Sequence, residues 1–340
     1  MKYVSRMWVI LLLSLIVACQ HNDDTELNIE NSRWLKIEGL NTAVNFNDIT
    51  FVGKHGWIVG ENGLYLSSQD SGATWKIRQN GSTSLLAVDF VDNNLGWMIN
   101  NRSQLDKTED SGLTWKHSLL PQDINKIDFI NTTEGWAIGY SGTILRTRNG
   151  GSSWSIQAAP TGYDFFVGLD IHFISNNKGW IAPWGTSGEN SGGVLFTEDG
   201  GETWQKQATD NVYYATGIDF INDSEGWVAM YDLTGNITCP KESNSFITSI
   251  YHTVNSGKDW QRISTLCGYS GDIDFVNQRY GWVLTKQPEQ PTHINVTEDG
   301  GITWATHYKS ETSLSRLQMR NPAEGWAIGD QGTVLHFSEH

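Results

Sequence analysis

The chain has 340 residues, with 23 Lys and Arg against 38 Asp and Glu, so its formal net charge is −15. A surface of this sign makes nucleic acid and bare anionic membrane poor partners, because both are negatively charged themselves. The length alone would suggest roughly two domains of about 150 residues each, but the repeats described below override that expectation.

The first 18 residues have the pattern of a secretory signal peptide. Lys2 and Arg6 supply a positive start, and an apolar run extends from Trp8 to Val17. This run is much shorter than the roughly 20 apolar residues that a membrane-spanning helix requires. We therefore expect residues 1–18 to be a cleaved signal rather than a transmembrane segment.

Cys19 follows Ile16-Val-Ala18 and is placed like the acylated cysteine of a bacterial lipobox. The alternative is an ordinary signal peptide with an incidental cysteine. We favour a lipoprotein whose Cys19 carries acyl chains such as palmitate. The polar and acidic residues that follow predict a flexible tether over 19–30. The expected location is the bacterial cell envelope, anchored by lipid at the outer membrane, on its periplasmic or surface face.

Six segments further along follow the pattern Ser/Thr-x-Asp/Asn-x-Gly-x-x-Trp, and the first runs from Ser68 to Trp75. The pattern is typical of a tight turn between strands: the Asp or Asn accepts backbone N–H bonds, the Gly takes a positive φ, and the Trp packs at the start of the next strand. We interpret the carboxylates and amides of these boxes as structural; they are Asp70, Asp110, Asn149, Asp199, Asn255 and Asp299.

A second motif, Gly-Trp, occurs seven times, at Trp57, Trp97, Trp136, Trp180, Trp227, Trp282 and Trp326. Between Gly-Trp and box lie alternating segments that predict short strands, with a period of about 40 to 55 residues. This period indicates an all-β fold, a seven-bladed β-propeller with four antiparallel strands per blade, occupying residues 31–340 as one domain. The seventh unit lacks its last strand, and we expect the N-terminal segment around Trp34 to supply it and close the ring.

These residues carry a family resemblance. The boxes resemble the Asp-box, or bacterial neuraminidase repeat. The run Gly135-Trp-Ala-Ile-Gly139, followed by Gly142-Thr-Ile-Leu145 and Asn149-Gly-Gly151, is more closely similar to the photosystem II assembly and stability factors. The resemblance covers nearly all of residues 30–340. It implies a seven-bladed propeller that binds membrane-protein assembly intermediates, although nothing in the chain points to a pigment or a photosystem. Sialidases share the boxes, but their Arg-Ile-Pro motif is missing here.

After Cys19, only Cys239 and Cys267 remain. We expect the first to lie in the long loop between the second and third strands of unit five, and the second to lie in the link from unit five to unit six. Both connections leave a four-stranded blade on the same face, and a secreted protein keeps its disulfides. We therefore predict a Cys239–Cys267 bridge, with two free thiols as the alternative.

Residues that break the repeat are the candidates for function. Trp184 is the one tryptophan outside the signal, the Gly-Trp motifs, the boxes and the closing strand. It lies within an insertion, residues 183–193, between the second and third strands of unit four, and aromatic residues gather in neighbouring links on the same face. We predict a ligand or partner site over units four to six, formed by Trp184, Tyr163, Phe165, Tyr213, Tyr214 and Tyr269. The alternative is that these rings are plugs between blades.

The acidic residues divide in the same way. One Asp recurs before the Phe of the inner strand, at Asp89, Asp128, Asp219 and Asp274, and we expect it to bind backbone or water near the central channel. His172 replaces it in unit four and is interpreted as an ordinary satisfied side chain. A glycosidase would need two facing carboxylates, and the off-repeat candidates on the loop side are Asp164, Glu189, Asp210, Asp232, Asp272 and Glu289.

The sequence thus favours a membrane-anchored, protein-binding or assembly scaffold of the cell envelope over an enzyme. The expected partner is an envelope or membrane protein, the expected state is a monomer, and no catalytic residue, metal ligand or cofactor motif is identified. The alternative is a carbohydrate-binding or glycoside-hydrolysing Asp-box propeller, because aromatic rings suit sugars as well as side chains.

Overall fold

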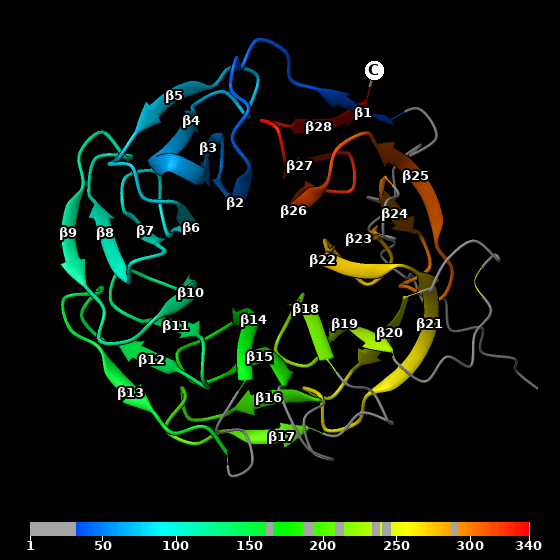
Figure 1. The fold of residues 1–340 in the computed structure, drawn as a ribbon. Helices are drawn as coiled ribbons and strands as arrows, with labels where there is room; N and C mark the ends of the chain where they lie inside the picture. Colours follow the sequence, from blue (N-terminus) through cyan, green and yellow to red (C-terminus); the bar gives the residue numbers. More distant parts are fainter. Residues whose placement is uncertain are drawn as a thin grey trace, which may run out of the picture.

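The computed structural model is a closed ring of seven four-stranded antiparallel sheets around a central opening (Figure 1). It describes residues 32–160, 166–185, 193–207, 214–232, 239, 246–286 and 291–339. In six of the sheets, strands that follow one another in the chain are hydrogen-bonded neighbours from the centre to the rim, and in the seventh the outer strand is β1. The predicted seven-bladed propeller is confirmed.

The blades are numbered 1 to 7 from the one that begins with β2. The inner strands are β2 (Phe46–Val52), β6 (Leu85–Phe90), β10 (Ile124–Phe129), β14 (Phe166–Phe173), β18 (Tyr214–Phe220), β22 (Tyr269–Phe275) and β26 (Leu314–Asn321). The second strands are β3 (His55–Gly60), β7 (Gly96–Asn100), β11 (Gly135–Gly139), β15 (Gly179–Gly185), β19 (Gly226–Asp232), β23 (Gly281–Lys286) and β27 (Glu324–Gly329). The third strands are β4 (Leu64–Ser68), β8 (Gln104–Thr108), β12 (Ile144–Thr147), β16 (Val194–Thr197), β20 (Ile247–Thr253), β24 (Thr292–Thr297) and β28 (Val334–Glu339). The outer strands are β5 (Lys76–Gln79), β9 (Lys116–Leu119), β13 (Ser155–Gln157), β17 (Gln205–Gln207), β21 (Gln261–Cys267), β25 (Ala305–Ser310) and β1 (Ser32–Lys36).

The two ends of the described chain meet in blade 7. Strand β1 pairs antiparallel with β28, so the blue and red ends lie side by side in Figure 1. Trp34 lies opposite Phe337, and their ring centroids are 5.1 Å apart. The N-terminal strand therefore closes the ring as predicted, and it covers an edge that would otherwise be open to another strand.

The six boxes form one repeated turn. In blade 2, Asp110 accepts the Thr114 backbone N–H at 2.8 Å, and the Thr108 hydroxyl accepts the Gly112 N–H at 2.9 Å. Gly112 has a φ of 84°, a conformation that favours glycine. The corresponding bonds recur in the other five boxes, with Asn149 and Asn255 accepting through their amide oxygens. The structural interpretation of the boxes is confirmed.

Adjacent blades are joined by the tryptophan of the Gly-Trp motif. The Trp97 ring stacks on Phe129 of the next blade at 3.7 Å and 1°, and its indole N–H donates to the Gly150 carbonyl in that blade's box at 3.1 Å. Five further pairs stack in the same way: Trp57–Phe90, Trp136–Phe173, Trp180–Phe220, Trp227–Phe275 and Trp326–Phe51. At the remaining junction, blade 7 has Met319 in place of the Phe.

The glycine of the motif has its own packing reason. A Cβ atom on Gly96 would lie 2.4 Å from the ring of Phe90 in the same blade, so no larger residue fits there. Each inner-strand Phe is therefore held between the backbone of its own second strand and the indole of the preceding blade. The Gly-Trp pair therefore joins adjacent blades.

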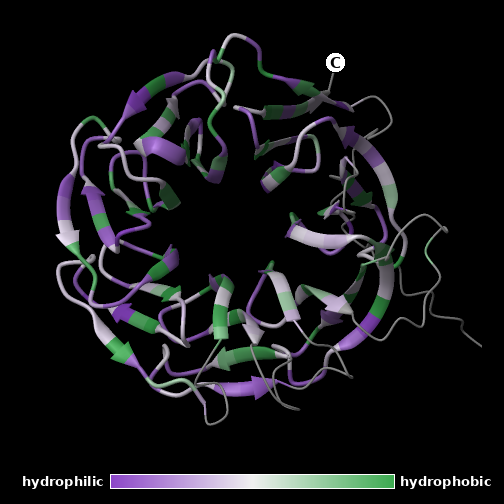
Figure 2. Cartoon of the chain, viewed as in Figure 1, coloured by the Kyte–Doolittle hydropathy of each residue, from purple (hydrophilic) through white to green (hydrophobic). Residues whose placement is uncertain are grey.

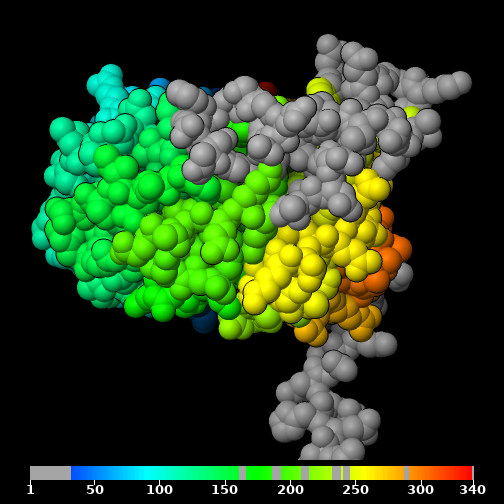
Figure 3. Space-filling view, turned by 90° about the horizontal axis from the view of Figure 1, so that it is seen from below, coloured from blue at the N-terminus to red at the C-terminus, as the bar shows by residue number. Residues whose placement is uncertain are grey.

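In blade 4 the middle strand β16 is largely green in Figure 2, whereas the outer strand β17 is mainly hydrophilic. Strands β7 and β11 are buried at every residue, whereas β9 is exposed at every residue. The side view in Figure 3 shows neighbouring blades packed against each other into one continuous wall. Among the described residues, no helix is long and apolar enough to cross a membrane.

The Phe129→Ala substitution should lower the free energy of unfolding by about 3–5 kcal/mol, because it removes a buried ring that both Trp97 and Trp154 contact. Urea denaturation followed by far-UV circular dichroism measures this change. Tyr140→Ala is the control, since Tyr140 is 50% exposed, and it should change stability by less than about 0.5 kcal/mol. Equal effects of the two substitutions would contradict the role of the stack.

Candidate functional site

Each inner strand has a β-bulge at the same place, where its pairing with the second strand shifts by one residue. A bulge redirects a side chain that regular alternation would point elsewhere. In blade 3 the bulged Asn125 donates to the Gly168 carbonyl of blade 4 at 2.9 Å, and Asn47 bridges blades 1 and 2 in the same way at 2.7 Å. The bulged residues are Asn47, Leu86, Asn125, Leu169, Thr216, Gly271 and Ser315. They lie toward the face that carries the links between blades, called here the loop face.

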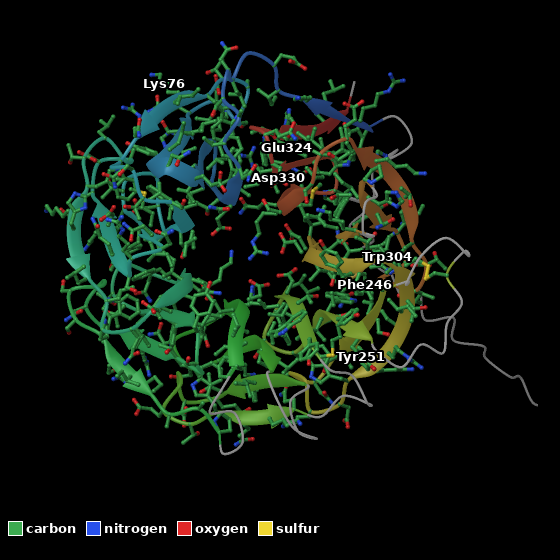
Figure 4. The ribbon with its side chains drawn as sticks, in the orientation of Figure 1. Lys76, Phe246, Tyr251, Trp304, Glu324 and Asp330 are labelled. Atoms are coloured by element: carbon green, nitrogen blue, oxygen red, sulfur yellow. A yellow bond between two sulfur atoms is a disulfide. The ribbon has the colours of Figure 1, made fainter. Side chains whose placement is uncertain are left out.

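Below the bulges, charged and polar side chains line a central channel of about 300 Å³. Figure 4 shows side-chain oxygen and nitrogen atoms projecting into this opening. The upper ring, nearer the loop face, contains Asp48, Lys126, Asp170, Asp272 and Arg316. The lower ring, two residues further along each strand, contains Thr50, Asp89, Asp128, His172, Asp219, Asp274 and Gln318.

The channel carboxylates also hold the blades together. Asp128 accepts the Phe173 backbone N–H of the next blade at 2.5 Å, and Asp274 accepts that of Met319 at 2.6 Å. Asp89 and Asp219 make the equivalent bonds in the lower ring, and Asp48, Asp170 and Asp272 make them in the upper ring. The prediction that the recurring Asp binds backbone at the channel is confirmed.

The two rings differ in how their charges are balanced. In the upper ring, Lys126 lies 3.3 Å from Asp48, and Arg316 lies 3.6 Å from both Asp48 and Asp272. In the lower ring, the one basic partner among the described residues is His172, 3.6 Å from Asp219. The upper ring therefore forms an ion-pair network, whereas the lower ring carries an excess of acidic side chains.

This imbalance changes the proton affinity of the carboxyls. Burial, with the charge of Asp48, raises the pKa of Asp89 to about 7. Burial, with the charge of Asp89, raises the pKa of Asp128 well above its ordinary value, and Asp274 is shifted in the same direction by burial and Asp219. Burial also raises the pKa of Asp272 to about 7 although Arg316 opposes the shift. Asp89 and Asp272 therefore bind protons more readily near neutral pH than ordinary carboxyls do.

Asp272 was expected on the loop side as an off-repeat acid, and this placement is wrong. It is buried in the channel, where it occupies the same upper-ring position as Asp48 and Asp170. The sequence missed the recurrence because the other occupants of that position are Lys126, Arg316 and small residues. Asp164, Glu189, Asp210 and Glu289 lie outside the described residues, as does the side chain of Asp232, so the glycosidase pair stays untested.

An aromatic cleft of about 370 Å³ opens on the loop face over blades 4 to 6. Its walls are Trp184, Tyr231, Phe246 and Tyr269, and its base contains Leu169, Thr216, Ser270, Gly271 and Arg316. The rings form a row: Trp184 stacks on Tyr214 at 4.4 Å, Tyr231 lies 5.4 Å from Phe246, and Phe246 meets Tyr269 edge-on at 5.8 Å. Phe246 is labelled in Figure 4 beside β22, on the side of the ring where this row lies.

The structure places three of the six predicted site residues in or beside this cleft. Trp184 and Tyr269 are each 37% exposed and form its walls, whereas Tyr214 supports the Trp184 ring from behind. All three belong to strands, at the end of β15 and the starts of β18 and β22, and the expectation that they lie in loops and links is wrong. Tyr163, Phe165 and Tyr213 lie outside the described residues. Ligand contact by any of the six stays a prediction.

Sequence reasoning missed Tyr231, Phe246 and Arg316. Tyr231 and Phe246 flank the longest insertion, and the structure shows that both line the same cleft as Trp184. The predicted Cys239–Cys267 disulfide is present and fastens this insertion to the end of β21. Among the described residues, no three His, Cys, Asp or Glu side chains are arranged to hold a metal ion.

Comparison with known proteins supports the resemblance. Residues 78–161 match the family model described as "Photosynthesis system II assembly factor YCF48". Over this segment the chain resembles the photosystem II assembly factors. A solved structure described as "YCF48 bound to D1 peptide" is 19% identical, with a TM-score of 0.68 over 90% of this chain and 95% of that one. YCF48 from Cyanidioschyzon merolae is 20% identical, with the same TM-score over 90% and 98%.

Enzymes share the same ring. The GH74 enzyme of Niastella koreensis is 15% identical, with a TM-score of 0.65 over 88% of this chain and 53% of the enzyme. Identities this low establish the fold alone. No curated protein sequence matches the chain.

Asp128→Asn should raise stability more at pH 8 than at pH 5. The folded pKa of Asp128 is above the unfolded value, so the native state binds more protons and its stability falls as pH rises between the two values. An asparagine keeps an oxygen that accepts the Phe173 N–H, but it does not titrate, so the fall in stability with rising pH is removed. Urea denaturation at both pH values measures the difference.

Asp110→Asn is the matched control, because hydrogen bonds from Thr114 lower the pKa of Asp110 to about 2. Its stability relative to the unmodified protein should stay constant from pH 5 to pH 8. An Asp128→Asn effect that is equally independent of pH would contradict the proton retention inferred for the lower ring.

Proposed function

We propose that this propeller is a lipid-anchored scaffold of the bacterial cell envelope, which uses the aromatic cleft to bind a segment of another envelope or membrane protein. The observation that carries the proposal is the cleft itself. Three rings from different blades, Trp184, Tyr231 and Tyr269, surround a cavity of about 370 Å³, which is within the usual size range of ligand sites.

Aromatic side chains gain most in binding when they line a central pocket from which the ligand displaces water. The cleft provides such a pocket, and it lies on strands of a ring that the Trp–Phe stacks hold rigid. A photosystem II assembly factor of the same fold has been solved with a peptide bound, which supports a peptide segment as the ligand class here. The membrane anchor and the envelope location rest on the signal-like residues 1–18 and on Cys19.

A second candidate is carbohydrate recognition. Trp184, Tyr214 and Tyr231 have nearly parallel ring planes, within 12° of one another, and flat parallel rings suit the faces of sugars. A GH74 enzyme with the same fold adds weight to this candidate. We favour the protein partner because a propeller of the same fold has been solved with a bound peptide.

Trp184→Ala should reduce capture of the partner by about tenfold or more, because it removes a large half-exposed ring from the cleft wall. The measurement is photo-crosslinking of the full-length chain in its own cells, followed by quantification of the specific crosslinked protein. Tyr140→Ala, which changes an exposed ring outside the cleft, should leave capture unchanged. If no specific protein is crosslinked, and the chain instead binds glycans in a way that depends on Trp184, the carbohydrate candidate would replace this proposal.

The anchor is tested by Cys19→Ser, which removes the thiol that acylation requires. We expect incorporation of labelled palmitate to be lost and the protein to move from the membrane fraction to the soluble fraction. Unchanged membrane association of the Cys19→Ser protein, without label in the parent, would contradict the lipoprotein.

A further inference from the structure

The aromatic cleft and the acidic channel are neighbouring parts of one surface. Arg316 lines both cavities. At the cleft base, Leu169 and Gly271 directly precede Asp170 and Asp272 of the upper ring. Leu169 and Gly271 are the bulged residues, and a bulge redirects the side chains next to it, so neighbouring residues of one strand line the cleft and the channel. A ligand in the cleft would therefore lie at the mouth of the channel.

The opening between the two cavities arises where the bulged residues differ from those of other blades. Asn47 and Asn125 reach across to the neighbouring blade and cover the rim. In blade 6 the same position is Gly271, which has no side chain. A Cβ atom there would make ordinary van der Waals contacts, the nearest with Leu284 at 3.7 Å. On the side of blade 6, the rim between the cleft and the channel therefore lacks the side chain that covers it in blades 1 and 3.

The charges beyond that opening are predominantly negative. Seven carboxyls line the channel, and its Lys and Arg residues are Lys126 and Arg316. Both cations already lie within 3.6 Å of Asp48, and Arg316 also lies 3.6 Å from Asp272. The channel carboxyls without an ion pair to Lys, Arg or His among the described residues are Asp89, Asp128, Asp170 and Asp274. A positive charge entering from the cleft would offset them, whereas a negative charge would be repelled.

We propose that the aromatic cleft selects a protein segment in which a Lys or Arg side chain is flanked by apolar residues, with its cation directed into the channel mouth. This inference rests on the protein-binding function proposed above and specifies the chemistry of the partner. The flanking apolar side chains pack against Trp184, Tyr231 and Phe246. The cation contacts aromatic faces on its way in, an arrangement that is itself attractive, and its charge complements the carboxylates beyond.

Proton release accompanies this mode of binding. Asp272 faces Arg316, Asp170, Lys126 and Asp274, and the pKa of this carboxyl is raised to about 7 by burial. Asp89 faces Asp48 and Asp128 and has a similarly raised pKa. A bound cation favours the ionised carboxylate, so binding expels protons. Affinity should rise with pH through about 7, by up to about tenfold between pH 6 and pH 8 for each carboxyl that loses a proton.

The test begins with a phage-displayed library of random linear peptides, selected against the intact protein in solution and counter-selected against Trp184→Ala. We expect Lys and Arg next to Leu, Phe or Trp to be enriched over the input library, and Asp and Glu to be depleted. The affinity of a synthetic copy of the most enriched peptide is then measured by calorimetry at pH 6 and pH 8.

Charge-removing variants separate the channel from the overall acidity of the protein. Asp170→Asn and Asp272→Asn each keep an oxygen for the backbone N–H that the aspartate binds, Ile218 and Leu317 respectively. Their combination should weaken the selected peptide about tenfold and reduce its pH dependence. Asp110→Asn removes one negative charge from a turn box on the opposite face and should have no effect. Circular dichroism and melting curves confirm that each variant is folded.

The outcomes distinguish the two levels of the proposal. The inference would be overturned if the peptides that depend on Trp184 showed no preference for Lys or Arg. It would also be overturned if their affinity did not change with pH or with the Asp170→Asn/Asp272→Asn substitutions. Either result would leave the protein-binding function standing. A selection that yields no peptide dependent on Trp184, together with glycan binding that does depend on it, would overturn both.

Discussion

The stack of one tryptophan on the phenylalanine of the next blade is the contact on which the ring depends. It occurs at six of the seven junctions, with centroids 3.5–3.8 Å apart. In five of these six pairs the indole N–H also donates to a backbone carbonyl of the next turn box, so one side chain joins the core of one blade to the turn of its neighbour. Because each stack needs a glycine beside it and a box in front of it, both sequence motifs follow from this single contact.

These motifs are also why the fold was predictable. The number of blades, the closing strand at Trp34 and the role of Asp110 and its equivalents were all correct, because each rests on a local pattern repeated six or seven times. The Cys239–Cys267 bridge was predictable from topology alone, since it required only that two connections lie on one face. The precise strand ends were not, and Trp184, Tyr214 and Tyr269 are strand residues because the strands of blades 4 to 6 are longer than the repeat suggests.

The candidate site was predictable only in part, for a physical reason. Trp184 stood out because it breaks the repeat, but Tyr231 and Phe246 acquire their importance from packing between residues that the sequence separates by a long insertion. The upper ring of the channel was hidden because its seven positions hold acids, bases and small residues. Its recurrence is geometric, set by the bulge in each inner strand, and no residue type marks it.

In the lower ring, the same aspartate side chains both stabilise the ring and bring poorly compensated charge into it. Asp89, Asp128, Asp219 and Asp274 each accept a backbone N–H from the next blade, which favours closure. An asparagine could make that bond without charge, as Asn149 and Asn255 do in the turn boxes. The carboxyls instead stay together in a confined space, where raised pKa values show that their charge is poorly compensated. The hydrogen bonds between blades do not require the negative charge of these carboxylates. In the proposed binding mode, that charge attracts the cation that enters from the aromatic cleft.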